Sequence, residues 1–144
     1  MFSVSVAGDL LPPYVCYKAE NLYDAWMENG PVGARYNQAK SGWFTSEIFC
    51  DCVMTIASPY FRRLDGPKIL IEDNLCSHIS FATIKKCLDE GINFIFFPPN
   101  STHLCQPLDV SVFKALKSNW STVISEWKHK NKGVIPKYFF LTNF

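Results

Sequence analysis

The chain opens on a pattern that predicts a β-hairpin. Residues Phe2–Val6 alternate apolar and small polar side chains, Gly8 and Asp9 supply a turn, and the apolar run Tyr14–Tyr17 follows. This pattern predicts two antiparallel strands, with Asp9 as a residue of the turn between them.

Helical spacing of apolar residues occurs three times further along the chain. Thr45 is a candidate N-cap for a helix that runs to about Arg62, Ser80 is a candidate N-cap for a second helix that stops at Gly91, and a third helix starts near Pro107. The expected apolar faces are Ile48, Cys52, Val53, Ile56 and Tyr60 in the first helix, Ile84, Cys87 and Leu88 in the second, and Phe113, Leu116, Trp120, Val123, Ile124 and Trp127 in the third.

Two short apolar runs flank the second of these helices. Lys68–Ile71 leads into polar residues, and Ile92–Phe97 is closed by Pro98 and Pro99. The second run is continuous, which is typical of a strand buried on both faces. A strand, a helical crossover and another strand predict a parallel pair. With the hairpin beside this pair, we expect an α/β fold in which helices flank a mixed sheet.

Residues 18–44 interrupt these regular elements. Breakers at residues 29–31 and 41–42 predict an insertion loop. The rings of Tyr23, Trp26, Tyr36 and Trp43 lie in it, either as buried anchors or as a contact surface. Residues 133–144 are expected to form a C-terminal tail.

Composition is that of a globular domain. Of the 144 residues 48% are hydrophobic and 15% are aromatic, which is too apolar for a disordered chain and enough for one packed core. The net charge is only +1, yet residues 110–144 hold six lysines against the single acid Glu126. Such a stretch can attract phosphates, although a solvated helix face gives the same count.

The six cysteines lie singly among apolar residues, which favours reduced thiols in an intracellular protein. Cys50 and Cys52 have no second cysteine or histidine pair at zinc-finger spacing, so we expect no zinc site. No apolar run approaches the length of a membrane-spanning helix.

Two aspartates are candidates for metal-dependent chemistry. Asp73 follows the strand Lys68–Ile71, at the sheet edge where ligands of α/β proteins usually bind. Asp109 lies four residues before Phe113, on the same helical stripe. Singly, the first fits an ordinary turn residue and the second an acid favoured by the helix dipole. Together they can bind divalent metal, and a metal pair can stabilise an in-line displacement at phosphate.

Other polar residues lie close to these acids in the sequence. His78 and His103 are candidates for phosphate contacts or general bases, or for ordinary histidines that hold loops by hydrogen bonds. Asn74 beside the first aspartate and the lysines Lys114 and Lys117 of the last helix are further candidates for nucleic-acid contacts.

A series of short motifs also runs along nearly the whole chain in a specific order: Leu11–Tyr14, Asn21–Trp26, Gly33–Tyr36, Lys40–Phe44, Gly66–Lys68, Asp73–Leu75, Ser77–Ser80, Pro98–Leu104 and Gln106–Asp109. In these motifs the chain resembles the DDE superfamily endonucleases derived from pogo-, tigger- and jerky-type transposons. It departs from them at Glu72, Cys76 and Cys105, where relatives often carry Gly, Ser and Thr.

The resemblance implies a ribonuclease H-like domain in which three acids bind the metals. Asp73 corresponds to the second acid and Asp109 to the third, with 35 residues between them. The first acid belongs to a central strand expected before Met1, so residues 1–144 are expected to be a partial domain, inactive on its own. Phe2–Val6 should then either pair antiparallel with Lys68–Ile71 or leave a gap beside it.

Cofactor, partner and location follow from the same resemblance. It implies Mg²⁺ or Mn²⁺ as cofactor, DNA as partner, metal-dependent strand cleavage and transfer as chemistry, and a nuclear location, with no membrane partner; homo-oligomerisation stays open. The alternative is a domesticated protein-interaction module that uses the aromatic loop from Tyr23 to Trp43. An unrelated nucleotide-binding fold is disfavoured because the sequence has no glycine-rich phosphate loop.

Overall fold

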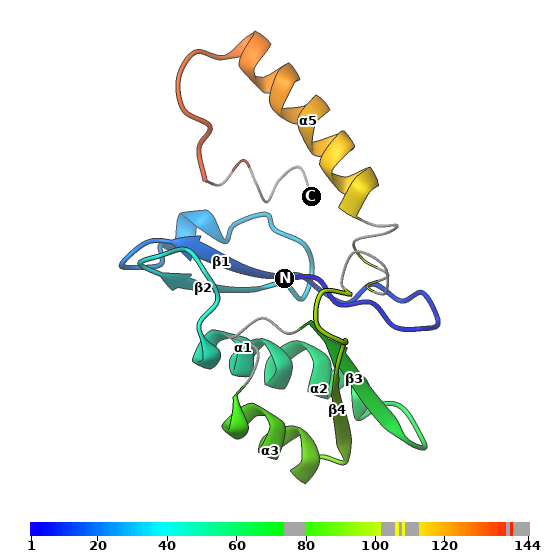
Figure 1. The fold of residues 1–144 in the computed structure, drawn as a ribbon. Helices are drawn as coiled ribbons and strands as arrows, with labels where there is room; N and C mark the ends of the chain where they lie inside the picture. Colours follow the sequence, from blue (N-terminus) through cyan, green and yellow to red (C-terminus); the bar gives the residue numbers. More distant parts are fainter. Residues whose placement is uncertain (74–79, 102–105, 107, 109–112, 138, 140–144) are drawn as a thin grey trace.

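The chain folds as an α/β protein in a computed structural model that describes residues 1–73, 80–101, 106, 108, 113–137 and 139 (Figure 1). The expectation of an α/β fold is confirmed. In chain order the regular elements are β1 (Tyr14–Lys18), η1 (Asp24–Trp26), β2 (Arg35–Ala39), α1 (Ser46–Cys52), η2 (Val53–Ala57), α2 (Ser58–Phe61), β3 (Lys68–Glu72), α3 (Phe81–Asp89), β4 (Ile92–Phe96) and α5 (Phe113–Lys130).

The strands of the described residues form two separate parallel pairs. β1 pairs with β2, and β3 pairs with β4 across the crossover helix α3. The predicted pairing of β3 with β4 is therefore confirmed, whereas the single mixed sheet is not what this part of the chain forms. The two pairs lie apart in Figure 1, with the helix α1–α2 packed against both.

The N-terminal arm forms the predicted turn but not a full strand. A lone antiparallel bridge joins Val4 to Leu10, and the Ser5 hydroxyl donates to the Asp9 carboxylate at 3.2 Å. Asp9 is thus a turn residue, as predicted. Phe2–Val6 was expected either to pair with β3 or to leave a gap beside it. Among the described residues the second arrangement is found, because the backbone of this arm bonds to residues 9–14 and β3 pairs with β4.

Part of the predicted insertion loop at 18–44 is regular structure. It contains the one-turn helix η1 and the strand β2, whose five residues pair in register with β1. The sequence Arg35–Ala39 has no apolar alternation, so the strand could not be recognised from its pattern. Backbone pairing with β1 selects this conformation, and the expectation of a continuous loop was wrong here.

One long helix connects both strand pairs. The Thr45 hydroxyl accepts the Ile48 backbone N–H at 3.3 Å, which confirms Thr45 as the N-cap. The helix continues through a five-residue π segment, η2, to Phe61. One of its faces packs against the β3–β4 pair through Phe49, Val53 and Ala57, and the other packs against Leu11 and Tyr14 through Ile48, Cys52 and Ile56.

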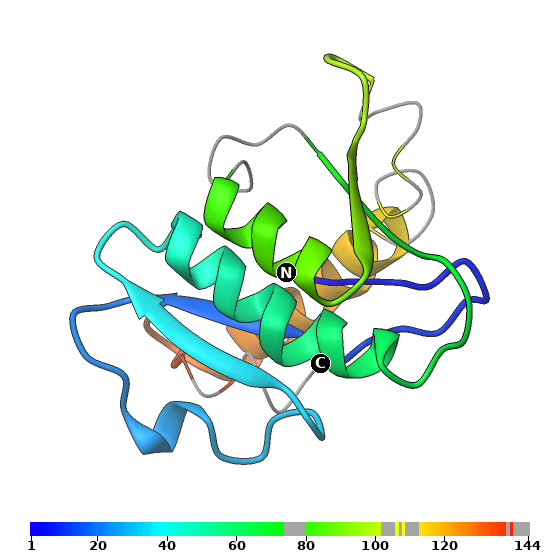
Figure 2. The same cartoon turned by 90° about the horizontal axis from the view of Figure 1, so that it is seen from below.

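The β3–β4 pair is buried on one face only. Leu70 and Ile92 are buried against the helices, whereas Ile69, Ile71 and Ile95 are 46–49% exposed. The expectation that Ile92–Phe97 is buried on both faces was therefore wrong. Figure 2 shows α3 running beside α1 and α2 on the covered side.

Helix α3 differs in detail from its predicted face. Thr83 and Cys87 are fully buried, and Cys87 packs in the core with Phe49 and Ile92, whereas Leu88 is 57% exposed. Ser80 precedes the helix without capping it through its side chain. Gly91 ends the element with a φ of +71°, in the left-handed region that favours glycine, as predicted.

Helix α5 carries the predicted apolar stripe without a fully buried residue. Phe113, Leu116, Trp120, Val123, Ile124 and Trp127 are all half-buried. Phe139 covers part of the stripe, with its ring 5.9 Å from that of Trp127. None of the helices in the described part of the chain has the length and apolar character that crossing a membrane requires.

Candidate metal site at the sheet edge

Asp73 lies at the carboxyl edge of the β3–β4 pair. β3 runs from Lys68, opposite Ile92, to Glu72, opposite Phe96, with the apolar residues of the strand between these two ends. The Phe97 backbone N–H donates to the Glu72 carbonyl at 2.9 Å, so the pairing reaches the end of both strands. Asp73 is the next residue, half-buried at this edge. In parallel α/β sheets this edge is the usual place for a ligand.

A tight turn follows β4 at the same edge. The Ser101 backbone N–H and hydroxyl both donate to the Pro98 carbonyl, at 3.2 and 2.7 Å. Asn100 has a φ of +59°, a left-handed conformation that asparagine tolerates better than most residues. The run of turn-forming residues after the strand is consistent with this turn, in which the bonds of Ser101 are local.

Glu72 lies on the helix side of β3. Burial raises the pKa of the Cys52 thiol to about 12, and the Glu72 carboxylate contributes to this shift. Side chains alternate along an extended strand, so Glu72 shares a side with Leu70, which is buried against the helices. Asp73 is the first residue after the strand.

The remaining predicted site residues divide into two groups. Asp109, Asn74, His78 and His103 lie outside the described residues, so the approach of Asp109 to Asp73 stays a prediction. Lys114 and Lys117 are exposed in the first turns of α5, where they can reach an external polyanion.

The donor chemistry of Asp73 suits a hard divalent cation, but the described residues do not complete a site. Mg²⁺ and Mn²⁺ prefer carboxylate oxygens and keep coordination positions for water and phosphate. In the described ranges no three His, Cys, Asp or Glu side chains gather closely enough to bind a metal ion.

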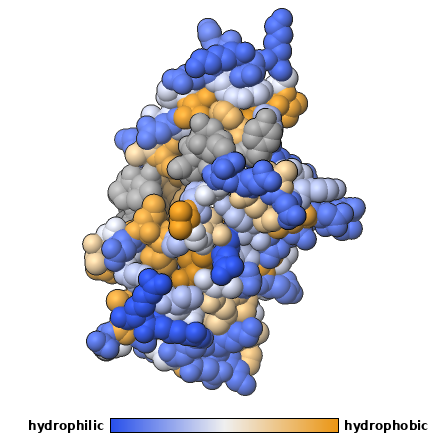
Figure 3. All heavy atoms as spheres, turned by 180° about the vertical axis from the view of Figure 1, so that it is seen from behind, coloured by the Kyte–Doolittle hydropathy of each residue, from blue (hydrophilic) through white to orange (hydrophobic). Residues whose placement is uncertain are grey.

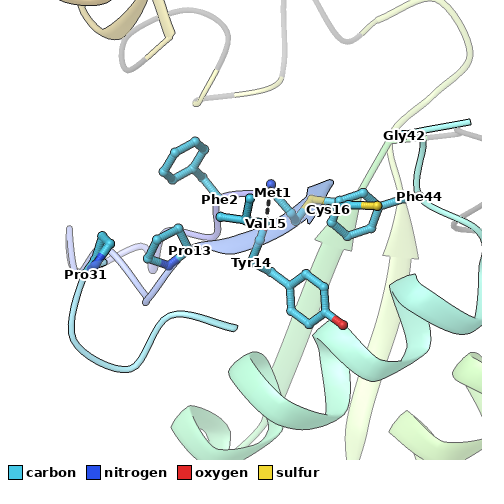
Figure 4. Close-up of a pocket in the computed structure, with 9 residues that line it drawn as sticks. All are labelled: Met1, Phe2, Pro13, Tyr14, Val15, Cys16, Pro31, Gly42 and Phe44. Atoms are coloured by element: carbon cyan, nitrogen blue, oxygen red, sulfur yellow. Dashed lines mark hydrogen bonds between the residues drawn. The ribbon is translucent and has the colours of Figure 1, made fainter. Parts of the chain in front are cut away.

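A separate cavity of about 240 Å³ lies between the N-terminal arm and β1 (Figure 4). Its lining is largely apolar and, in the part of the chain that is described, includes no carboxylate or histidine. Tyr14 points from β1 toward helix α1, where its hydroxyl donates to Asp51 and accepts from the Asn37 amide at 3.0 Å. These bonds tie β1, β2 and α1 together, so the network is structural. Sequence reasoning did not find it.

Comparison with known proteins identifies one family. Residues 1–137 match the family described as DDE superfamily endonuclease. A curated relative named MFS-type transporter clz9, from Cochliobolus lunatus, is 29% identical over 147 aligned positions. That alignment covers 98% of this chain, whereas the chain spans only 16% of the relative's length. No solved structure matches the chain.

Proposed function

The chain belongs to the DDE superfamily endonuclease family, and on that premise we propose that it carries part of a metal-dependent site for DNA strand cleavage and transfer. In this proposal Asp73 and Asp109 are ligands for Mg²⁺ or Mn²⁺ in a ribonuclease H-like arrangement of the pogo, tigger and jerky type. Asn74, His78, His103, Lys114 and Lys117 contact the nucleic acid. The expected cellular location is the nucleus.

The observation that carries the proposal is the position of Asp73 in a β3–α3–β4 unit of a DDE-family chain. β3 and β4 are parallel across the helical crossover α3, so their carboxyl ends share one edge, and Asp73 follows the first of them. A divalent ion held there would neutralise charge on a phosphate during in-line displacement. The basic stretch of α5 would add a salt-dependent attraction for the DNA backbone.

Calorimetric titration with Mn²⁺ tests the metal site. We expect the wild-type chain to bind the ion weakly, and Asp73→Asn and Asp109→Asn each to lower the affinity at least about tenfold, because each removes a ligand. Asp89→Asn is the matched control. Asp89 ends α3 at the opposite edge of the sheet, roughly 17 Å away along a five-residue strand. Equal affinities in the wild type, Asp73→Asn and Asp109→Asn would refute the proposal.

We further propose that residues 1–144 alone neither nick nor join DNA. Two dications about 4 Å apart repel strongly, and the two proposed carboxylates offset less of that charge than the three of the family site. Incubation with Mg²⁺ or Mn²⁺ and supercoiled DNA should give no more product than the double variant Asp73→Asn, Asp109→Asn. Metal-dependent nicking abolished by either single substitution would overturn this part of the proposal.

A second candidate function is a protein-interaction module. The supporting observation is the exposure of large rings between β1 and α1: Trp43 is 78% exposed and Tyr23 is 56% exposed. Aromatic side chains that are exposed in a free protein are often buried at the centre of its interface with a partner. Pull-down with the wild type and a Trp43→Ala variant, with and without nuclease treatment, separates a protein partner from one tethered by DNA.

A further inference from the structure

A lysine ammonium group lies on the face of Trp26. The Lys137 Nζ is 3.9 Å from the centre of the Trp26 ring and donates a hydrogen bond to the Lys18 carbonyl at 3.0 Å. Lys137 comes from the segment after α5, far from Trp26 in sequence. Two different interactions, one with an aromatic face and one with a carbonyl oxygen, therefore converge on the same cation.

The aromatic side of this contact is held by residues near β1. The Tyr17 ring lies 5.3 Å from the Trp26 ring and the Tyr23 ring lies 4.8 Å from it. The buried Tyr17 donates its hydroxyl proton to the Trp26 carbonyl at 2.9 Å. None of these bonds includes Lys137, so the ring surface does not depend on the lysine for its shape.

The charge around Trp26 also favours a cation. Of the acids in residues 19–34, Glu20 is paired with Lys40 at 3.1 Å, which leaves Asp24 and Glu28 on either side of Trp26. Asp24 begins the helix η1 that carries Trp26, and both Asp24 and Glu28 are exposed. A half-buried aromatic ring with carboxylates nearby can attract an ammonium group from another chain when Lys137 leaves it.

The segment that supplies Lys137 is weakly attached. Helix α5, which leads into it, has no fully buried residue. Segments with little buried apolar surface open at low free-energy cost. Lys137 is therefore suited to leave Trp26 when another cation competes for the site.

We propose that Trp26 and the Lys18 carbonyl form a binding site for a lysine side chain of another polypeptide, and that Lys137 occupies this site in the free chain. The preferred ligand is an unmodified or monomethylated lysine, because the Lys18 carbonyl requires an N–H donor. A trimethylated lysine keeps the charge but loses that bond. The site is distinct from the proposed metal site and does not depend on it.

The test measures the Trp26 indole N–H resonance during titration with Nα-acetyl-lysine amide. The variant Lys137→Met should bind this probe about two- to fivefold more tightly than the wild type, since the internal competitor is gone. Lys132→Met, which removes another lysine from the segment after α5, should behave as the wild type. Nα-acetyl-norleucine amide, which has a similar length and no charge, should not shift the resonance.

Variants of the ring make the result specific. In the Lys137→Met background, with binding followed through the backbone amide resonances of residues 17–19 because the indole signal is lost, Trp26→Leu should weaken binding of the lysine probe by about two- to fivefold and Trp26→Phe should weaken it less. Equal binding by Lys137→Met and the wild type, or tighter binding of the trimethylated probe, would overturn the proposal. A shift caused by oligothymidylate and not by lysine probes would do so too, and would identify a base-stacking surface.

Discussion

Helix α1–α2 and helix α5 are both amphipathic, yet only the first one builds a core. The residues of α1, η2 and α2 include six apolar side chains that are at most 7% exposed, packed between the two strand pairs. The apolar stripe of α5 is only half-buried, and Figure 3 shows hydrophilic side chains over the outer surface at that end of the molecule. A helical apolar pattern thus predicts which face is covered but not how completely.

Substitutions in the two helices should differ most in their effect on stability. Phe49 is 1% exposed and its ring lies 6.3 Å from that of Phe94. Phe49→Ala should lower the free energy of unfolding by about 3–5 kcal/mol, because it leaves a cavity. Leu116→Ala on α5 should lower it by about 1 kcal/mol or less. Urea denaturation followed by circular dichroism measures both, and equal losses would break the comparison.

The polar ties of the core should have the next largest effect. Tyr14→Phe removes the hydroxyl shared by Asp51 and Asn37, so we expect a loss of about 1–3 kcal/mol in the free energy of unfolding. Tyr36→Phe is the control on the neighbouring strand. Its hydroxyl makes no hydrogen bond within the described ranges, and the substitution should change stability by about 0.5 kcal/mol or less. If Tyr36→Phe lowered the free energy of unfolding as much as Tyr14→Phe, the hydrogen bonds of Tyr14 would not be the cause of its effect.

A smaller effect should come from Glu90, which ties the end of α3 to α2. Its hydrogen bonds from Ser58 and Arg62 lower the pKa of the carboxyl group below 4.5. The group therefore stabilises the fold above its unfolded pKa, and this contribution is lost as the pH falls through the lower folded pKa. Glu90→Gln should lower stability by about 1 kcal/mol or less at pH 7. The difference from the wild type should shrink as the pH falls below the unfolded pKa and disappear once it is below the folded pKa, and a constant difference in acid titrations would contradict the assignment.

Elements with clear apolar periodicity could be predicted from the sequence. The helix from Thr45, the parallel strands on either side of α3 and the half-buried stripe of α5 all follow from apolar spacing and local turn chemistry. β2 could not be predicted, because Arg35–Ala39 is selected by pairing with β1 rather than by its own pattern. Burial was overestimated for Ile95 and Leu88, since a run of apolar residues does not reveal which neighbours cover it.

The candidate site was predictable only in part. The position of Asp73 followed from the strand that precedes it, whereas the contribution of the Glu72 carboxylate to the raised pKa of the buried Cys52 thiol depends on how the helix packs. The contact of Lys137 with Trp26 joins residues far apart in the chain and has no local sequence pattern. Long-range polar contacts of this kind are decided by tertiary packing.

The most direct test of the central claim, that a divalent ion binds at the Asp73 edge, is paramagnetic broadening of amide resonances by Mn²⁺. The account predicts that Glu72, Phe97 and Ser101 broaden at low Mn²⁺ concentration, while Lys68 and Ile92 at the opposite edge do not. Asp73→Asn should abolish the effect, and Asp89→Asn should leave it intact. Broadening that is uniform along both strands, or that persists in Asp73→Asn, would contradict the account.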